Sequence, residues 1–82
     1  MKTEQSVVSV LGAGSYGTAL AISFARNGHA VTLWGRNADD VEALATERKN
    51  QRYLPDITFP ETLKLESDLA KAVKASQIIL VV

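Results

Sequence analysis

Cysteine is absent from this 82-residue sequence, and histidine occurs only once. Disulfides and thiolate metal sites are therefore excluded, as is a zinc site built from several histidines. No apolar run reaches the roughly 18 residues that a membrane span needs. Neither sign of charge is in excess, with nine basic and nine acidic residues, so the composition does not indicate the basic surface that binds nucleic acid.

The amino terminus, Met-Lys-Thr-Glu-Gln, is polar and lacks the apolar core of a secretory signal. The hydrophobic fraction of 46% is that of an ordinary folded chain. From these features we expect a soluble, cytoplasmic protein that inserts into no membrane, binds no nucleic acid and holds no metal.

Strand-like and helix-like segments alternate along the chain. Short, β-branched, apolar runs predict strands at 6–11, 30–34 and 77–82, the first of them a buried strand of a parallel sheet, with a weaker strand at 62–65. Helical spacing predicts a helix at 16–27, with an inner face that comprises Gly17, Leu20, Ala21, Phe24 and Ala25. Gly28 follows this helix at the position of a left-handed cap.

Two further helices are predicted. One begins after Asn37 and buries Val41, Leu44 and Ala45, and the other has Ser67 as its N-cap and buries Leu69, Ala72 and Val73. The segment 50–60 contains two prolines and is expected to be irregular. The resulting order is typical of an α/β fold, a Rossmann-like doubly wound parallel sheet that is incomplete in this sequence.

The last predicted strand reaches Val82. In an open parallel sheet the ligand crevice lies outside the carboxyl ends of the strands, so the loop after this strand would line it. We therefore expect residues 1–82 to form part of a nucleotide-binding domain, as the N-terminal fragment of a longer protein.

The sequence Gly-Ala-Gly-Ser-Tyr-Gly at 12–17 fits the G-x-G-x-x-G pattern between a predicted strand and a helix. Gly12 permits a tight turn, Gly14 allows a pyrophosphate to approach the backbone, and Gly17 allows close packing of the helix on the strand. Ser15 and Tyr16 stand at the helix N-terminus, where backbone N–H groups favour an anion. The pattern predicts a dinucleotide site.

Arg36 stands just after the second strand, where an acidic residue would bond the ribose of NAD. Its guanidinium suits a 2′-phosphate, which favours NADP(H) and leaves NAD(H) as a second cofactor. Tyr53, in the proline-bounded loop, is a further candidate for cofactor contact. Trp34 and His29 are read as packing and turn residues, and the basic residues Arg48, Lys49 and Arg52 as a solvated helix end.

Four stretches resemble one family. They are V-L-G-A-G-S-Y-G-T-A-L-A, A-R-N-G-H-A-V-T-L-W-G-R-N, N-Q-R-Y-L-P-D-I-T-F-P and L-E-S-D-L-A-K-A-V-K-A-S-Q-I-I-L-V-V. Over residues 6–82 the chain is similar to the bacterial NAD(P)-dependent sn-glycerol-3-phosphate dehydrogenases.

The resemblance implies an oxidoreductase that transfers a hydride between NAD(P)H and dihydroxyacetone phosphate or sn-glycerol 3-phosphate, and so feeds phospholipid synthesis. It places cofactor contacts on Ser15, Tyr16 and Arg36, with Tyr53 as a further candidate. It places the catalytic lysines and the phosphorylated substrate beyond residue 82, so no catalytic residue is assigned in this chain. A homodimer of the full-length protein is left open.

Two other functions compete with this one. The chain could be a non-catalytic nucleotide-binding module, or the N-terminal part of another NADP-dependent reductase such as a ketopantoate reductase. The Trp34-Gly35-Arg36 and Tyr53-Leu54-Pro55 sequences weigh against the second alternative.

Overall fold

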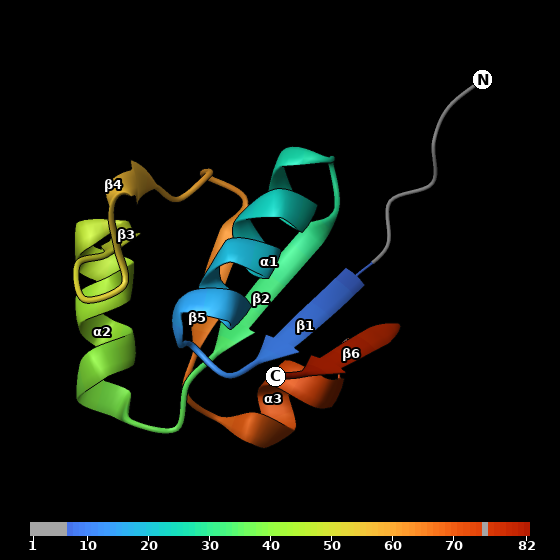
Figure 1. Cartoon of the computed structure of the whole chain (residues 1–82). Helices are drawn as coiled ribbons and strands as arrows, with labels where there is room; N and C mark the ends of the chain where they lie inside the picture. The colour runs from blue at the N-terminus through green and yellow to red at the C-terminus, as the bar shows by residue number, and fades with distance from the viewer. Residues whose placement is uncertain (1–6, 75) are drawn as a thin grey trace.

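The computed structural model describes residues 7–74 and 76–82, so Ser6, where the sequence predicts the first strand to begin, lies outside the described residues. The order of elements alternates strands and helices as expected (Figure 1). The elements are β1 (Val7–Leu11), α1 (Ser15–Arg26), β2 (Ala30–Trp34), α2 (Ala38–Glu47), β3 (Lys49–Asn50), β4 (Leu54–Thr58), β5 (Leu63–Glu66), α3 (Leu69–Lys74) and β6 (Ile78–Val81).

Four of the strands form one parallel sheet in the order β5-β2-β1-β6. Val8 of β1 is in register with Val31 of β2 on one side and with Ile78 of β6 on the other. The chain moves outward from β1 to β5 and then crosses back to β6, which is the strand arrangement of half a doubly wound sheet. The predicted α/β fold class is confirmed.

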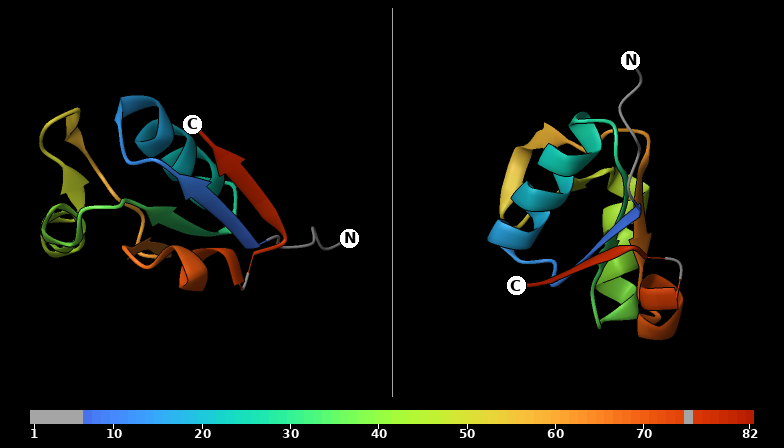
Figure 2. Two further views of the ribbon diagram at one scale, coloured as in Figure 1. Left: turned by 90° about the horizontal axis from the view of Figure 1, so that it is seen from below. Right: turned by 90° about the vertical axis from the view of Figure 1, so that its right-hand side faces the viewer.

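Helices lie on both faces of this sheet. Helix α1 covers one face and α3 the other, while α2 flanks the sheet next to β5 (Figure 2). Because both faces are covered, β1 and β2 carry the mostly apolar sequences of buried parallel strands. Their side chains and those of α1 form most of the core, which comprises Val8, Val10, Ala21, Ile22, Ala25, Val31, Leu33, Leu44, Phe59 and Leu63.

The segment 50–60 is not wholly irregular, so that prediction was wrong. Strands β3 and β4 pair there as an antiparallel ribbon, with Lys49 opposite Thr58 and Asn50 opposite Leu54. Pro55 lies inside β4. Proline is tolerated in a strand that has a free edge, and a two-stranded ribbon has such an edge on each strand.

The predicted helix faces and caps need corrections in all three helices. In α1 the fully buried residues include Thr18 and Ile22, whereas Leu20 and Phe24 are only half-buried. In α2, Ala45 is exposed, and in α3, Leu69 is exposed and Val73 is only half-buried. Asp68 rather than Ser67 caps α3, since its Oδ1 accepts a hydrogen bond from the backbone N–H of Lys71 at 3.2 Å.

The predicted cap at the start of α2 and the predicted left-handed glycine after α1 agree with the structure. Asn37 is the N-cap of α2, and its side-chain oxygen accepts from the N–H of Asp40 at 3.0 Å. Gly28 has a φ of 90°, the left-handed conformation expected just after α1. Asn37 thus fixes where α2 begins, and Gly28 fixes where the chain turns from α1 toward β2.

Candidate functional site

The glycine turn joins β1 to α1 at the carboxyl end of the sheet. Gly12 has a φ of 129°, a conformation that favours glycine, and its N–H donates to the carbonyl of Trp34 at 2.9 Å. The turn is thereby tied to the end of β2. This places the N-terminus of α1 and the residues after Trp34 at the same end of the sheet.

Gly14 and Gly17 have opposite surroundings. A Cβ on Gly17 would lie 1.9 Å from the carbonyl oxygen of Gly12, so helix and strand are too close for any side chain there. A Cβ on Gly14 would meet nothing within 4 Å. Gly17 therefore serves the packing of α1, and Gly14 leaves open space in front of the turn.

The first turn of α1 suits an anion. Gly14 is the N-cap and provides no side-chain hydrogen bond, and the first turn holds no acidic residue. The first N–H groups of a helix lack partners within it, and the helix dipole favours negative charge there. Ser15 and Tyr16 are exposed at this end, Tyr16 to 68%. The turn can therefore hold a phosphate group, and no acidic side chain of the first turn competes for its N–H groups.

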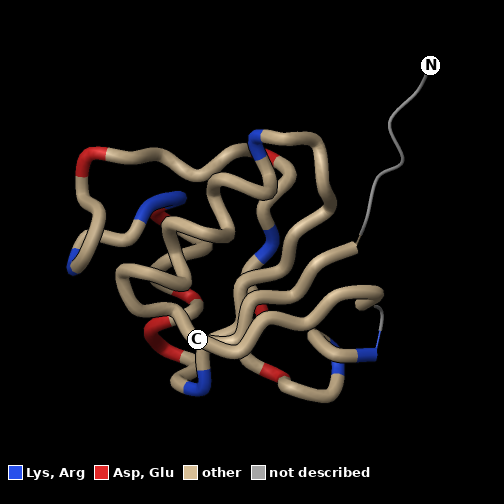
Figure 3. Tube along the Cα trace, turned by 45° about the vertical axis from the view of Figure 1, so that its right-hand side comes forward, with Lys and Arg blue, Asp and Glu red and all other residues tan. Residues whose placement is uncertain are grey.

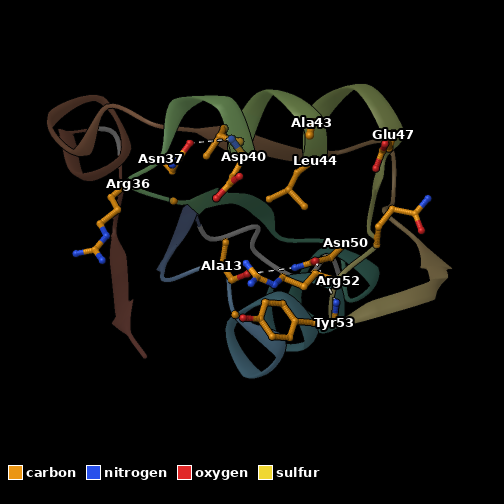
Figure 4. A pocket seen from close by; sticks show the side chains of 14 residues that line it. Ala13, Arg36, Asn37, Asp40, Ala43, Leu44, Glu47, Asn50, Arg52 and Tyr53 are labelled. Carbon is orange, nitrogen blue, oxygen red and sulfur yellow. Dashed lines mark hydrogen bonds between the residues drawn. The ribbon is translucent and has the colours of Figure 1, made fainter.

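A pocket opens beside this turn, between α2 and the β3–β4 ribbon. Its volume is about 590 Å³. Figure 4 shows α2 along one wall and the residues after Asn50 along the other. The lining comprises Ala13, Gly14, Gly35, Arg36, Asn37, Asp40, Val41, Ala43, Leu44, Glu47, Asn50, Gln51, Arg52 and Tyr53.

Charges of both signs line this pocket. Arg36 and Arg52 are the cations, and Asp40 and Glu47 are the anions, both contributed by α2. Basic and acidic residues are also interspersed along the rest of the described chain (Figure 3). Any anionic ligand in the pocket must therefore be placed close to the arginines and away from α2.

Asn50 joins the β3–β4 ribbon to the glycine turn, and sequence analysis did not identify it as a site residue. Its side chain is buried, and its Nδ2 donates to the carbonyl of Ala13 at 3.1 Å and to Oγ1 of Thr18 at 3.0 Å. Its Oδ1 accepts from the N–H of Tyr53 at 3.3 Å. One amide thus fixes the ribbon to the glycine turn. The only signal in the sequence was its place at the start of the N-Q-R-Y-L-P stretch.

The predicted cofactor contacts occupy different parts of this region. Gly14, Arg36 and Tyr53 line the pocket together. Ser15 and Tyr16 stand next to it on the exposed end of α1 and are not among its lining residues. Gly12 and Gly17, as described above, shape the turn itself.

The basic residues at 48–52 are not one solvated cluster, so that interpretation was wrong for Arg48. Its Nη2 donates to the carbonyls of Pro60 at 2.8 Å and Leu63 at 2.9 Å, and its guanidinium lies 5.8 Å from the centre of the Phe59 ring. Arg48 also ends α2 in a left-handed conformation, with a φ of 59°. Its role is to hold the chain between β4 and β5.

Trp34 and His29 fit their predicted structural roles. The indole Nε1 of Trp34 donates to the carbonyl of Ser67 at 3.1 Å, and the residue is half-buried. The His29 ring packs edge-on against Phe24, with centroids 5.9 Å apart. Across the described residues, no group of three or more His, Cys, Asp or Glu side chains could hold a metal ion. The helices of the same residues are all too short or too polar to cross a membrane.

Comparison with known proteins identifies the family. Residues 7–82 match the family described as "NAD-dependent glycerol-3-phosphate dehydrogenase N-terminus". This chain belongs to that family. Over all 82 residues it is 71% identical to a glycerol-3-phosphate dehydrogenase [NAD(P)+] of Pseudoalteromonas translucida and spans 24% of that protein's length. The predicted family is thus confirmed.

Solved structures of the family have the same fold. The glycerol-3-phosphate dehydrogenase of Coxiella burnetii superposes with a TM-score of 0.88 at 44% identity, over 94% of this chain and 24% of that one. The Saccharomyces cerevisiae glycerol-3-phosphate dehydrogenase gives a TM-score of 0.81 at 29% identity, over 96% and 26%. The chain therefore spans about a quarter of the relatives that it matches.

Proposed function

We propose that residues 1–82 are part of the NAD(P)-binding domain of a glycerol-3-phosphate dehydrogenase. The full-length enzyme would transfer a hydride between NAD(P)H and dihydroxyacetone phosphate or sn-glycerol 3-phosphate. The observation that carries the proposal is the glycine turn, which stands at the carboxyl end of a parallel sheet and leaves open space in front of Gly14. Membership of the family supplies the reaction.

The residues present fit a dinucleotide. Gly14 has room for a phosphate where a side chain would otherwise project, and the first turn of α1 offers N–H groups to it. The pocket next to the turn has two arginines for further phosphate oxygens. When bound, the nicotinamide supplies or accepts the hydride. We propose that Gly12, Gly14, Ser15, Tyr16, Gly17, Arg36 and Tyr53 form the adenosine and pyrophosphate side of this site.

The catalytic and substrate-binding residues belong, in this proposal, to parts of the enzyme beyond residue 82. Cytoplasmic location, a place in phospholipid precursor synthesis and a homodimeric assembly are part of the same proposal and rest on the resemblance. The two alternatives, a non-catalytic module and a different reductase, are disfavoured by the match to the dehydrogenase family over residues 7–82.

The test is an assay of the full-length enzyme. We expect oxidation of NADPH, followed by its absorbance, to depend on added dihydroxyacetone phosphate and to be absent with ketopantoate. The matched control is the Gly14→Val enzyme, which should retain its fold by circular dichroism and lose cofactor binding. Turnover of ketopantoate instead of the triose phosphate, or of neither, would contradict the proposal.

A further inference from the structure

Arg52 is the pocket arginine that is directed inward. It leaves the ribbon between β3 and β4, and its guanidinium carbon lies 5.8 Å from the centre of the Tyr53 ring. Figure 4 shows Arg52 extending along Tyr53 into the pocket, in the direction of the glycine turn, whereas Arg36 stands at the far end and points outward. The two arginines therefore reach different parts of any ligand that lies along the pocket.

The backbone that carries Arg52 is held in place. Asn50 and Tyr53 flank it, and the amide of Asn50 bonds both to the N–H of Tyr53 and to the carbonyl of Ala13 in the glycine turn. The stretch from Asn50 to Tyr53 is thus anchored to the turn that would hold the phosphates. A guanidinium stacked on an aromatic ring also loses less rotational freedom when it binds an anion.

The charge of the opposite wall makes a cation at this place useful. Asp40 and Glu47 line the pocket from α2, and both would repel a pyrophosphate. The glycine turn offers N–H groups but no positively charged side chain of its own, since its residues are Gly, Ala, Ser and Tyr. Arg52 is the inward-directed cation that lines the same pocket as Gly14.

We propose that Arg52 binds the pyrophosphate of the dinucleotide, while Arg36 reads the 2′-phosphate. This inference rests on the proposed function, because it assumes that the pocket takes NAD(P)H. It assigns a different phosphate group to each arginine. Arg52 acts on a group common to NADH and NADPH, so it adds affinity for both cofactors, and Arg36 acts on a group that only NADPH has.

The experiment compares Arg52→Gln and Arg36→Gln in the full-length enzyme, with Arg26→Gln as the control. Arg26 is exposed in the last turn of α1, at the opposite end of the helix from the glycine turn. The probes are NADH, NADPH and adenosine 2′-monophosphate, which has the 2′-phosphate and no pyrophosphate. Dissociation constants for the first two come from fluorescence titration, and the inhibition constant of the third from competition with NADPH.

Because Arg52→Gln removes a charged hydrogen bond, we expect it to raise the dissociation constants of NADH and NADPH alike, by about 10- to 100-fold. The inhibition constant of adenosine 2′-monophosphate should stay unchanged. Arg36→Gln should weaken the binding of NADPH and of the monophosphate and leave the binding of NADH unchanged. Unchanged NADH binding in Arg52→Gln, or an equal loss for the monophosphate, would overturn the assignment. If the unsubstituted enzyme binds neither dinucleotide, the proposed function itself fails, which is a different outcome.

Discussion

Two glycines of one turn should respond in opposite ways to the same added methyl group. Gly17→Ala places a Cβ 1.9 Å from the carbonyl oxygen of Gly12, 3.0 Å from its carbonyl carbon and 2.9 Å from Cγ2 of Val82. The valine methyl can rotate away, but the carbonyl is backbone and cannot. Gly14→Ala meets no atom within 4 Å. The first change should therefore affect folding, and the second should affect the ligand.

The magnitude for Gly17→Ala follows from the distance. Ordinary contact begins at 3.4 Å, so α1 must move about 1.5 Å away from the turn. A gap of about 1 Å already forfeits up to half of each dispersion contact, and Ala21, Ile22 and Ala25 all pack from α1 onto the sheet. Overpacked cores lose typically 1–3 kcal/mol and occasionally more, so we expect a loss of about 3 kcal/mol or above.

The expectation for Gly14→Ala is different. Gly14 has a φ of −76° and a ψ of −168°, an extended conformation that alanine adopts without strain. The free energy of unfolding should change by less than about 0.5 kcal/mol, because the lower entropy of the unfolded chain offsets a poorer N-cap. The new methyl group would occupy the space that a phosphate needs, so cofactor affinity should fall at least about tenfold, or 1.4 kcal/mol.

Both variants are measured in the full-length enzyme by urea unfolding without cofactor, since a bound ligand would add its own stabilisation. Fluorescence titration with NADPH then gives the affinity of the folded protein. An unfolding midpoint for Gly17→Ala equal to that of the unsubstituted enzyme would refute the packing argument. Normal NADPH affinity in Gly14→Ala would refute the assignment of the open space to a phosphate.

Two further predictions concern the end of β2. Arg36→Asp should weaken the binding of NADPH more than that of NADH, because a carboxylate there repels the 2′-phosphate. Equal losses of affinity in the two titrations would show that Arg36 does not contact this group. Trp34→Phe removes the indole N–H that donates to the carbonyl of Ser67, so the free energy of unfolding should fall by about 1 kcal/mol. Its NADPH affinity should stay within about twofold of normal, and a larger loss would make Trp34 a cofactor contact.

The residues that sequence analysis identified correctly have roles set by their immediate neighbours. The turn at 12–17 needs glycine for reasons that a strand, a turn and a helix in succession make visible. The cap of α2 by Asn37 depends on Asp40, only three positions along the chain. Such local rules also locate most strands of the parallel sheet, because β1, β2 and β6 are mostly apolar, whereas the alternating β5 gives a weaker signal.

The residues that it misread depend on partners far along the chain. Arg48 looked like a solvated helix end, yet its hydrogen bonds go to Pro60 and Leu63, which are 12 and 15 positions away. The β3–β4 ribbon was missed because β3 has only two residues and β4 contains proline. Nothing in the composition of residues 50–60 indicates that they pair with one another.

The same distinction explains why the pocket could not be predicted as a whole. Its ribbon wall is joined to the glycine turn and α1 by Asn50, whose partners Ala13 and Thr18 are 37 and 32 positions earlier in the chain. No short pattern encodes a bond over that separation. Once the fold brings the ribbon to the turn, a single buried amide sets where Arg52 and Tyr53 stand relative to Gly14. In the proposed site, the motif thus provides the place for a phosphate, whereas the tertiary contact determines which side chains would meet the rest of the nucleotide.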